Sequence, residues 1–224
     1  MRIHHSVLTI VAAIAALTVS SLARADDPGD RALLEASVGI GVADRSSTGI
    51  GDPLLGMGYD QSFGPLASLD VRLFVADGDY AYVRHGPVLR AAHHAGPSMG
   101  TWTGHAFRAT SFDLGYAGRV EFRCMRSDEM RVHLGGFVGI TGLHADAGRG
   151  DVERANTDGA TIEAARTLDH AALGGVLGVN LDLHFGAFLV GVGVDLHQWF
   201  GIDTRVARDL MLAAQLRVGV DLPL

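Results

Sequence analysis

The amino-acid sequence predicts an all-β protein, an eight-stranded antiparallel up-and-down β-barrel. Apolar and polar residues alternate with a period of two, which is typical of strands with two unlike faces. Glycine is abundant at 30 of 224 residues, and all 18 basic residues are arginine. Many glycines indicate turns, or strands whose backbones approach one another closely. The alternating segments span residues 32–43, 66–76, 80–92, 106–123, 130–143, 168–184, 187–199 and 209–222.

The first 25 residues have the pattern of a secretory signal peptide. Arg2 opens a short polar start, Val7 to Val19 are an apolar run, and Ala23-Arg24-Ala25 has the small-x-small form of a cleavage site. An apolar run of this length is too short to span a bilayer, which takes about 20 residues. The sequence therefore predicts a signal peptide over 1–25 and one barrel domain over 26–224.

Charge and cysteine content exclude several classes of protein. Removal of Arg2 and Arg24 leaves 16 of the 18 arginines against 25 acids, a formal charge of −9. A chain this acidic is not predicted to bind nucleic acid, because phosphate backbones select basic surfaces. The single cysteine, Cys124, excludes an internal disulfide and is interpreted as an unpaired thiol.

The connections between the predicted strands alternate in length. Short turns follow the second, fourth and sixth segments, and longer connections follow the first, third and fifth. Small outer-membrane barrels have this arrangement, with tight periplasmic turns and longer outer loops. The longer connections cover about 44–65, 93–105 and 144–167, and an intermediate one covers about 200–208.

The distribution of charge predicts which face lies inside. No apolar stretch after the signal peptide approaches 18 residues, so a closed β-barrel is the one remaining fold that could span a membrane. One face of the alternating segments collects seven acids and seven arginines, whereas the central part of the other carries only His85 and Gln198. A lipid-facing Arg at mid-membrane costs about 2–4 kcal/mol, so the charged face is predicted to line the lumen. This predicted network comprises Glu35, Asp70, Arg72, Arg84, Arg90, Asp113, Arg119, Glu121, Arg123, Arg131, Asp182, Asp195, Arg217 and Asp221.

Glycines and aromatic residues favour the same orientation. Many glycines share the charged face, where they would leave room for long Arg side chains in a narrow lumen. Aromatic residues gather near the strand ends, which resembles two interfacial girdles. The residues assigned to these girdles are Tyr80, Tyr82, Phe122, Phe185 and Phe188 at the short turns, and Trp102, Phe107, Trp199 and Phe200 at the long loops.

The last segment carries Arg217, Gly219 and Leu222 at the spacing with which outer-membrane barrels end. On these features the chain resembles the broad family of small bacterial outer-membrane β-barrel proteins, over nearly all of 26–224 and at the level of pattern. The resemblance implies residence in the bacterial outer membrane, contact with its lipid and lipopolysaccharide, and insertion by the barrel-assembly machinery. The terminal Leu224, which follows Pro223, departs from the aromatic residue that ends most members.

Candidate catalytic and metal-binding residues lie near the long loops. A lipid hydrolase would need a nucleophile such as Ser98 or Ser111 beside a histidine, but in the chain after the signal peptide no histidine stands two residues from a serine on one strand face. His93-His94 and the acids of the third loop lack the ligand spacing of zinc or calcium sites. We therefore predict no catalytic residue, metal or cofactor, and interpret the histidines at these loops as interfacial polar residues: His93, His94, His105, His144 and His170.

The predicted function is that of a non-enzymatic outer-membrane barrel with a filled lumen. Eight strands enclose just enough space for side chains, and open channels have about twice as many. The role is then structural, or lies in the outer loops through a ligand that the sequence does not identify. One alternative is a membrane-embedded enzyme that modifies lipid or lipopolysaccharide. The other is an exported soluble barrel that binds a small apolar ligand with its apolar face inward.

Overall fold

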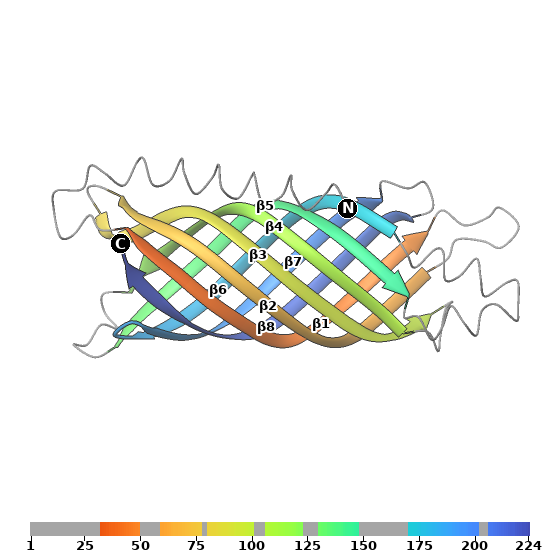
Figure 1. Ribbon diagram of the computed structural model, residues 1–224, viewed down its shortest axis with the longest axis horizontal. Coiled ribbons are helices and arrows are strands. Elements are labelled where there is room, and N and C mark those ends of the chain that lie inside the picture. The colour runs from red at the N-terminus through yellow and green to blue at the C-terminus, as the bar shows by residue number, and fades with distance from the viewer. Residues whose placement is uncertain are drawn as a thin grey trace, which may run out of the picture.

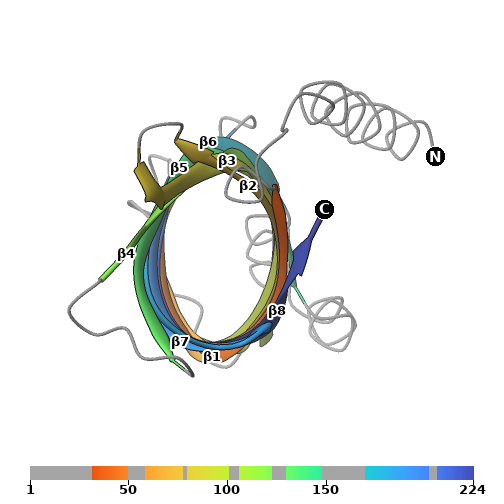
Figure 2. The ribbon, with the colours of Figure 1, turned by 90° about the vertical axis from the view of Figure 1, so that its left-hand side faces the viewer.

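The protein is a closed antiparallel barrel of eight strands in a computed structural model, which describes residues 32–49, 59–77, 80–100, 106–122, 130–147, 170–201 and 206–224. Each strand pairs with the next along the chain, and β1 pairs with β8 to close the ring (Figures 1 and 2). This confirms the predicted fold class. The strands are β1 (Leu33–Gly49), β2 (Tyr59–Asp77), β3 (Tyr80–Gly100), β4 (Ala106–Glu121), β5 (Arg131–Ala147), β6 (His170–Phe185), β7 (Phe188–Gly201) and β8 (Val206–Pro223).

The two ends of the barrel are named here by their connections. At the turn end, residues 78–79, 122–130 and 186–187 join consecutive strands, and the first residues of β1 lie beside the last of β8. At the loop end the connections are 50–58, 101–105, 148–169 and 202–205. Gly186 takes a φ of 62° at the turn between β6 and β7, a conformation that glycine adopts without steric cost.

Several strands run further toward the loop end than predicted. β2 begins at Tyr59 instead of residue 66, and β3 ends at Gly100 instead of residue 92. The β1–β2 ladder continues out to the pair Thr48 and Tyr59. A ladder needs only backbone groups, so pairing continues into polar sequence where the alternation of side chains has ended. The connections at the two ends therefore differ less in length than predicted.

The two faces of the barrel wall are unlike. Large apolar side chains are exposed on the outside, and most charged side chains of the strands are buried inside. On β6 the exposed apolar residues run from Leu173 to Phe185, a stretch about 29 Å high at a rise of about 3.4 Å per residue and a tilt of about 45°. An outer-membrane barrel carries an apolar band about 25 Å tall, so the two heights are comparable. Among the residues that the structure describes, no helix has the length and apolarity to cross a membrane.

Apolar side chains also fill two parts of the interior. One cluster lies toward the loop end and includes Leu66, Leu143, Trp199 and Met211 with several alanines. The other contains Phe74, Val88, Ala117, Phe137 and Val176. The charged residues are therefore packed among hydrophobic neighbours in a filled interior. The opening inside the ring of Figure 2 is the space that these side chains occupy.

Trp199 was assigned to the girdle at the loop end, and this assignment is wrong. Its side chain is fully buried inside the barrel, where Nε1–H donates to Thr141 Oγ1 at 3.1 Å and the ring stacks on His197. Trp199 shares a face with His197 and Asp195, which stand two and four residues earlier, so its orientation follows from the period of two. Phe185 and Phe188 at the turn end and Phe200 at the loop end are exposed outside.

The fluorescence of Trp199 tests this placement. Trp102→Phe leaves Trp199 as the sole tryptophan, since the chain has two. Because Trp199 is buried in the lumen, its emission is expected to be blue-shifted and unaffected by brominated lipids, which quench residues at the lipid-facing surface. Strong quenching by those lipids would place the ring outside. Trp102 itself lies outside the described residues, as do the predicted signal peptide, Cys124 and His105.

A candidate functional site in the lumen

The structure places most residues of the predicted network inside the barrel. Arg84, Glu121 and Arg131 lie at the turn end and are partly exposed, and Arg131 donates to the carbonyl of Gly186. Arg123 lies outside the described residues. The remaining members of the predicted set are at most 5% exposed: Glu35, Asp70, Arg72, Arg90, Asp113, Arg119, Asp182, Asp195, Arg217 and Asp221.

Glu35 is the centre of this network. Its carboxylate accepts hydrogen bonds from Arg217 at 2.8 Å and from Arg119 at 2.9 Å, and Arg72 lies 3.6 Å away. These arginines belong to β8, β4 and β2, so one carboxylate of β1 links four strands. Register places Arg72 directly beside Glu35, whereas Arg119 reaches it across the lumen.

Arg217 extends the network to β6, and Asp70 extends it to β3. Arg217 donates to both carboxylate oxygens of Asp182 at 3.0 and 2.9 Å, and to Ser37 Oγ at 3.0 Å. Asp70 lies within 4 Å of three guanidinium groups, those of Arg72, Arg90 and Arg217. Buried charges of one sign are thus surrounded by charges of the other, which is the condition under which buried ions persist.

A second group of contacts continues toward the loop end. Arg90 pairs with Asp195 at 2.7 Å and lies 4.0 Å from Asp113. Gln215 donates to Asp195 at 2.8 Å and accepts from Ser68 at 2.6 Å. Asp113 in turn accepts a hydrogen bond from His197 Nε2 at 3.0 Å. Arg90 therefore joins the group around Glu35 to the cluster that contains Trp199.

Aromatic rings pack against the guanidinium planes. Arg119 lies 4.5 Å from the centre of the Phe74 ring, and Arg72 and Arg90 lie 5.7 and 5.6 Å from that of Phe137. Cation–π contacts are more favourable where the cation is shielded from solvent, and these three arginines are almost fully buried. Phe74 and Phe137 thus contact the arginines as well as filling apolar volume.

Four arginines and six acids form this connected set, so the described network carries two acids in excess. Histidines contact two of the acids: His197 lies beside Asp113, and His184 Nδ1 lies 3.2 Å from Asp221. Neither histidine was part of the predicted network, because a count of formal charge passes over histidine. Both stand on the inward face by the same period of two.

Sequence reasoning also missed an ion pair at the loop end. Arg45 donates to Asp209 at 2.7 Å, and both side chains are almost fully buried. The predicted first strand ended at residue 43, so Arg45 was placed in a loop. It stands two residues after Ala43 on the same face, and extension of the alternation by one step would have found it.

The cluster of Glu35, Asp182 and His184 has the composition of a metal site, with one ligand atom from each residue within 4.8 Å of the others. Arg217 donates to both carboxylates, however, and occupies the position that a cation would take. The arrangement is that of an ion-pair network, because a divalent cation would be repelled by the guanidinium group already bound there.

The serines and histidines near the loop end do not form a catalytic arrangement. Ser111 is buried and its hydroxyl has no hydrogen-bond partner among the described residues, while the side chain of Ser98 lies outside the description. Ser62 Oγ does lie 3.2 Å from His94 Nε2, but both residues are buried, and His94 Nδ1 faces the carbonyl of Pro65. The Ser62 side chain is fully buried, and the two nitrogens of the His94 ring face Ser62 Oγ and the Pro65 carbonyl, so the contact is an ordinary interior hydrogen bond.

His93 and His94 lie on β3 and not in a loop, and their side chains point to opposite faces. His94 is buried in the lumen and His93 is exposed outside, beside Thr110. His144 is also exposed on the outer face. The two exposed histidines fit the predicted interfacial role, whereas His94 does not.

The chain is similar in fold to solved bacterial surface proteins. Neisserial surface protein A is 15% identical, with 84% of this chain and 96% of that chain covered and a TM-score of 0.41. The outer membrane protein OprG from Pseudomonas aeruginosa is 10% identical, with 88% and 99% covered and a TM-score of 0.45. The attachment invasion locus protein of Yersinia pestis is 10% identical, with 84% and 98% covered and a TM-score of 0.38. Similarity at this level says nothing about activity. No protein-family model and no curated protein sequence matches the chain.

Proposed function

We propose that this protein resides in the bacterial outer membrane as a non-enzymatic barrel with a closed lumen. The observation that carries the proposal is the inversion of the two faces: charges are buried inside and large apolar side chains are exposed outside. In water such an exterior would expose a continuous apolar surface, whereas in a bilayer it contacts lipid chains. The signal peptide predicted at the N-terminus would direct the chain to this location.

The same inversion argues against the soluble alternative, in which the apolar face points inward. Val192, Val194 and Leu196 are exposed on the outer face of β7, and Asp195 between them is buried. The enzymatic alternative finds no exposed serine–histidine pair among the described side chains. A structural role, or a role of the connections at the loop end, is therefore the function that the geometry supports best.

The filled lumen supports a barrel that does not conduct ions. Glu35, Asp70 and Arg217 inside the barrel are each only 1% exposed, so almost no solvent reaches them from either end. Passage of an ion would require several of the ion pairs to separate at once. We infer that the network holds the barrel closed and fixes which strands adjoin, and that it lines no pore.

The expected partners are outer-membrane lipid, lipopolysaccharide and the barrel-assembly machinery. β8 carries the end pattern Arg217, Gly219 and Leu222 and closes the ring against β1. Leu224 continues this pairing, because its backbone N–H donates to the carbonyl of Ala32 at 2.9 Å. We expect the assembly machinery to complete the barrel at this junction of β1 and β8.

Fractionation and bilayer recordings test both parts of the proposal on one preparation. The protein is expected in detergent extracts of the outer membrane and should migrate faster on a gel unless boiled, because a closed barrel stays folded in detergent. In planar bilayers it is expected to give no channels above background. Recovery as a soluble periplasmic protein without a heat shift would overturn the location. Regular single-channel steps from the purified barrel would overturn the closed lumen.

A further inference from the structure

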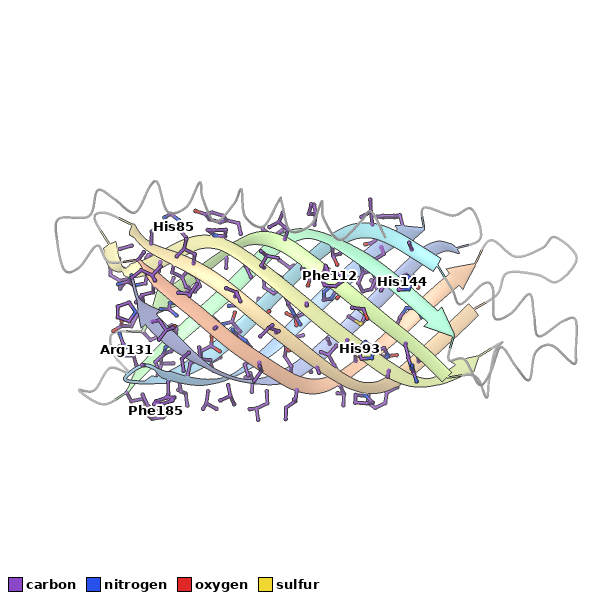
Figure 3. The ribbon with its side chains drawn as sticks, in the orientation of Figure 1. His85, His93, Phe112, Arg131, His144 and Phe185 are labelled. Atoms are coloured by element: carbon purple, nitrogen blue, oxygen red, sulfur yellow. The ribbon has the colours of Figure 1, made fainter. Side chains whose placement is uncertain are left out.

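A row of polar side chains crosses the outer face of β3, β4 and β5 near the loop end. His93, Thr110 and His144 are consecutive partners in the register of these strands. His93 and His144 are exposed, and His93 Nδ1 lies 3.0 Å from Thr110 Oγ1. Figure 3 shows His93 and His144 in the half of the barrel opposite His85, Arg131 and Phe185. We call His93, Thr110, His144 and their neighbour Arg108 the rim row.

Arg108 brings a positive charge to this row. It is the next outward residue of β4 toward the loop end, exposed, and about 7 Å along the strand from Thr110. Neither Arg108 nor His144 has an ion pair or hydrogen bond with any side chain that the structure describes. The row thus offers guanidinium and imidazole N–H donors to the surroundings of the barrel, on a chain with an acidic net charge.

Immediately below the rim row the surface becomes apolar. Phe112, the next outward residue of β4, is 59% exposed and is partnered by Ala91 on β3 and Gly142 on β5. A Cβ added at Gly142 would meet only the Leu173 side chain, at 3.7 Å. Because Ala91 and Gly142 have small or no side chains, the Phe112 ring stands above the surface on both sides. The hydrogen-bond donors of the rim row and the apolar surface around Phe112 are therefore suited to an amphiphile with an anionic head group and acyl chains.

We propose that the rim row binds a phosphate group of a phosphorylated glycolipid of the lipid A type in the outer leaflet. His93 and His144 stand two strands apart, about 10 Å, so their rings can approach one phosphate from both sides. Thr110 lies between them, and Arg108 reaches the phosphate from the loop end with its planar fork of donors. The acyl chains then lie along Ala91, Phe112 and Gly142. This rests on the proposed outer-membrane location, with the loop end outward.

Native mass spectrometry of the detergent-solubilised barrel, with bis-phosphorylated lipid A as the probe, tests the site. The triple variant Arg108→Gln, His93→Ala, His144→Ala is expected to bind this lipid at least about tenfold less well, the equivalent of losing one hydrogen bond to a charged group. Fully dephosphorylated lipid A should bind the wild type as weakly as the variant binds the intact lipid. Excess inorganic phosphate should not displace the lipid, because it has no chains for the apolar surface.

His85→Ala is the matched control, since His85 is a partly exposed histidine of β3 at the turn end, bonded to Tyr116. It should leave binding unchanged. Asp146→Asn, at the register partner of Arg108, should bind at least as well, and weaker binding would indicate a cation site instead. Retention by the triple variant within twofold of wild type, equal binding of dephosphorylated lipid A, or a preference for phosphatidylglycerol would each overturn the assignment. The heat shift of every variant reports barrel integrity separately, so loss of lipid binding is distinguishable from failure of the membrane proposal.

Discussion

Replacement of Glu35 by alanine is expected to destabilise the barrel by about 3–5 kcal/mol, the usual cost of removing one partner from a buried ion-pair network. The carboxylate touches three arginines, and each of these side chains is almost fully buried. Without Glu35, Arg119 retains Asp221 and Arg217 retains Asp182. Arg72 is left with the more distant carboxylate of Asp70 at 3.8 Å and a hydrogen bond to the neutral Asn180 at 3.1 Å. Urea unfolding of the barrel in lipid vesicles, followed by the heat shift on gels, measures the loss.

Two further variants show whether charge is responsible. Glu35→Gln preserves the volume and one acceptor, so a loss close to that of alanine attributes the effect to the charge. Asp44→Asn removes an exposed acid of the same strand and should change the free energy of unfolding by at most about 1 kcal/mol, as for other surface ion pairs. If Glu35→Ala unfolded within 1 kcal/mol of wild type, the arginines would not depend on the carboxylate.

The prediction for Glu35 illustrates what the sequence could and could not supply. Its inward position followed from the period of two, because neighbouring strand residues must point to opposite faces. The ion-pair partners of Glu35 could not be predicted from this period. Arg72 and Arg217 stand on the two strands that pair with β1, but Arg119 meets Glu35 only because the curvature of a closed ring brings β4 to the same point of the lumen.

The ends of the strands were least predictable, and the errors there share one cause. Arg45 and His94 fell in predicted loops because the apolar alternation stops near residues 43 and 92. The backbone ladder continues past both points, and the side chains beyond keep the same two orientations. Trp199 was assigned by its chemical type to an interfacial girdle, yet its parity with Asp195 already placed it inside.

The residues of the rim row are brought together by the register of the strands. His93, Thr110 and His144 are separated by 17 and 34 residues in the chain, and no local motif connects them. They become neighbours because the β3–β4 and β4–β5 hairpins align them across three strands. The sequence did predict that His93 and His144 lie near the long loops, and both residues lie near the loop end of the barrel.

The second large effect on stability is predicted for substitution of two adjacent glycines of β6, Gly174 and Gly175. Gly174 faces the lumen, and a Cβ there would overlap the backbone of Gln198 and Trp199 on β7. Gly175 faces outward, and a Cβ there would meet only the carbonyl oxygen of Gly139, at 3.8 Å. Gly174→Ala therefore requires β6 and β7 to separate and is expected to cost about 1–3 kcal/mol, as for other overpacked positions.

Gly175→Ala is the matched control and should be neutral or stabilise the barrel by about 0.5–1 kcal/mol, because alanine loses less conformational freedom than glycine on folding. Both variants are compared with wild type by urea unfolding in the same vesicles. Opposite signs for two adjacent glycines would show that the inward glycines are required by close approach of backbones at the lumen wall, and that outward ones are not. Equal effects of the two substitutions would contradict this account, since strand propensity alone does not distinguish the two faces.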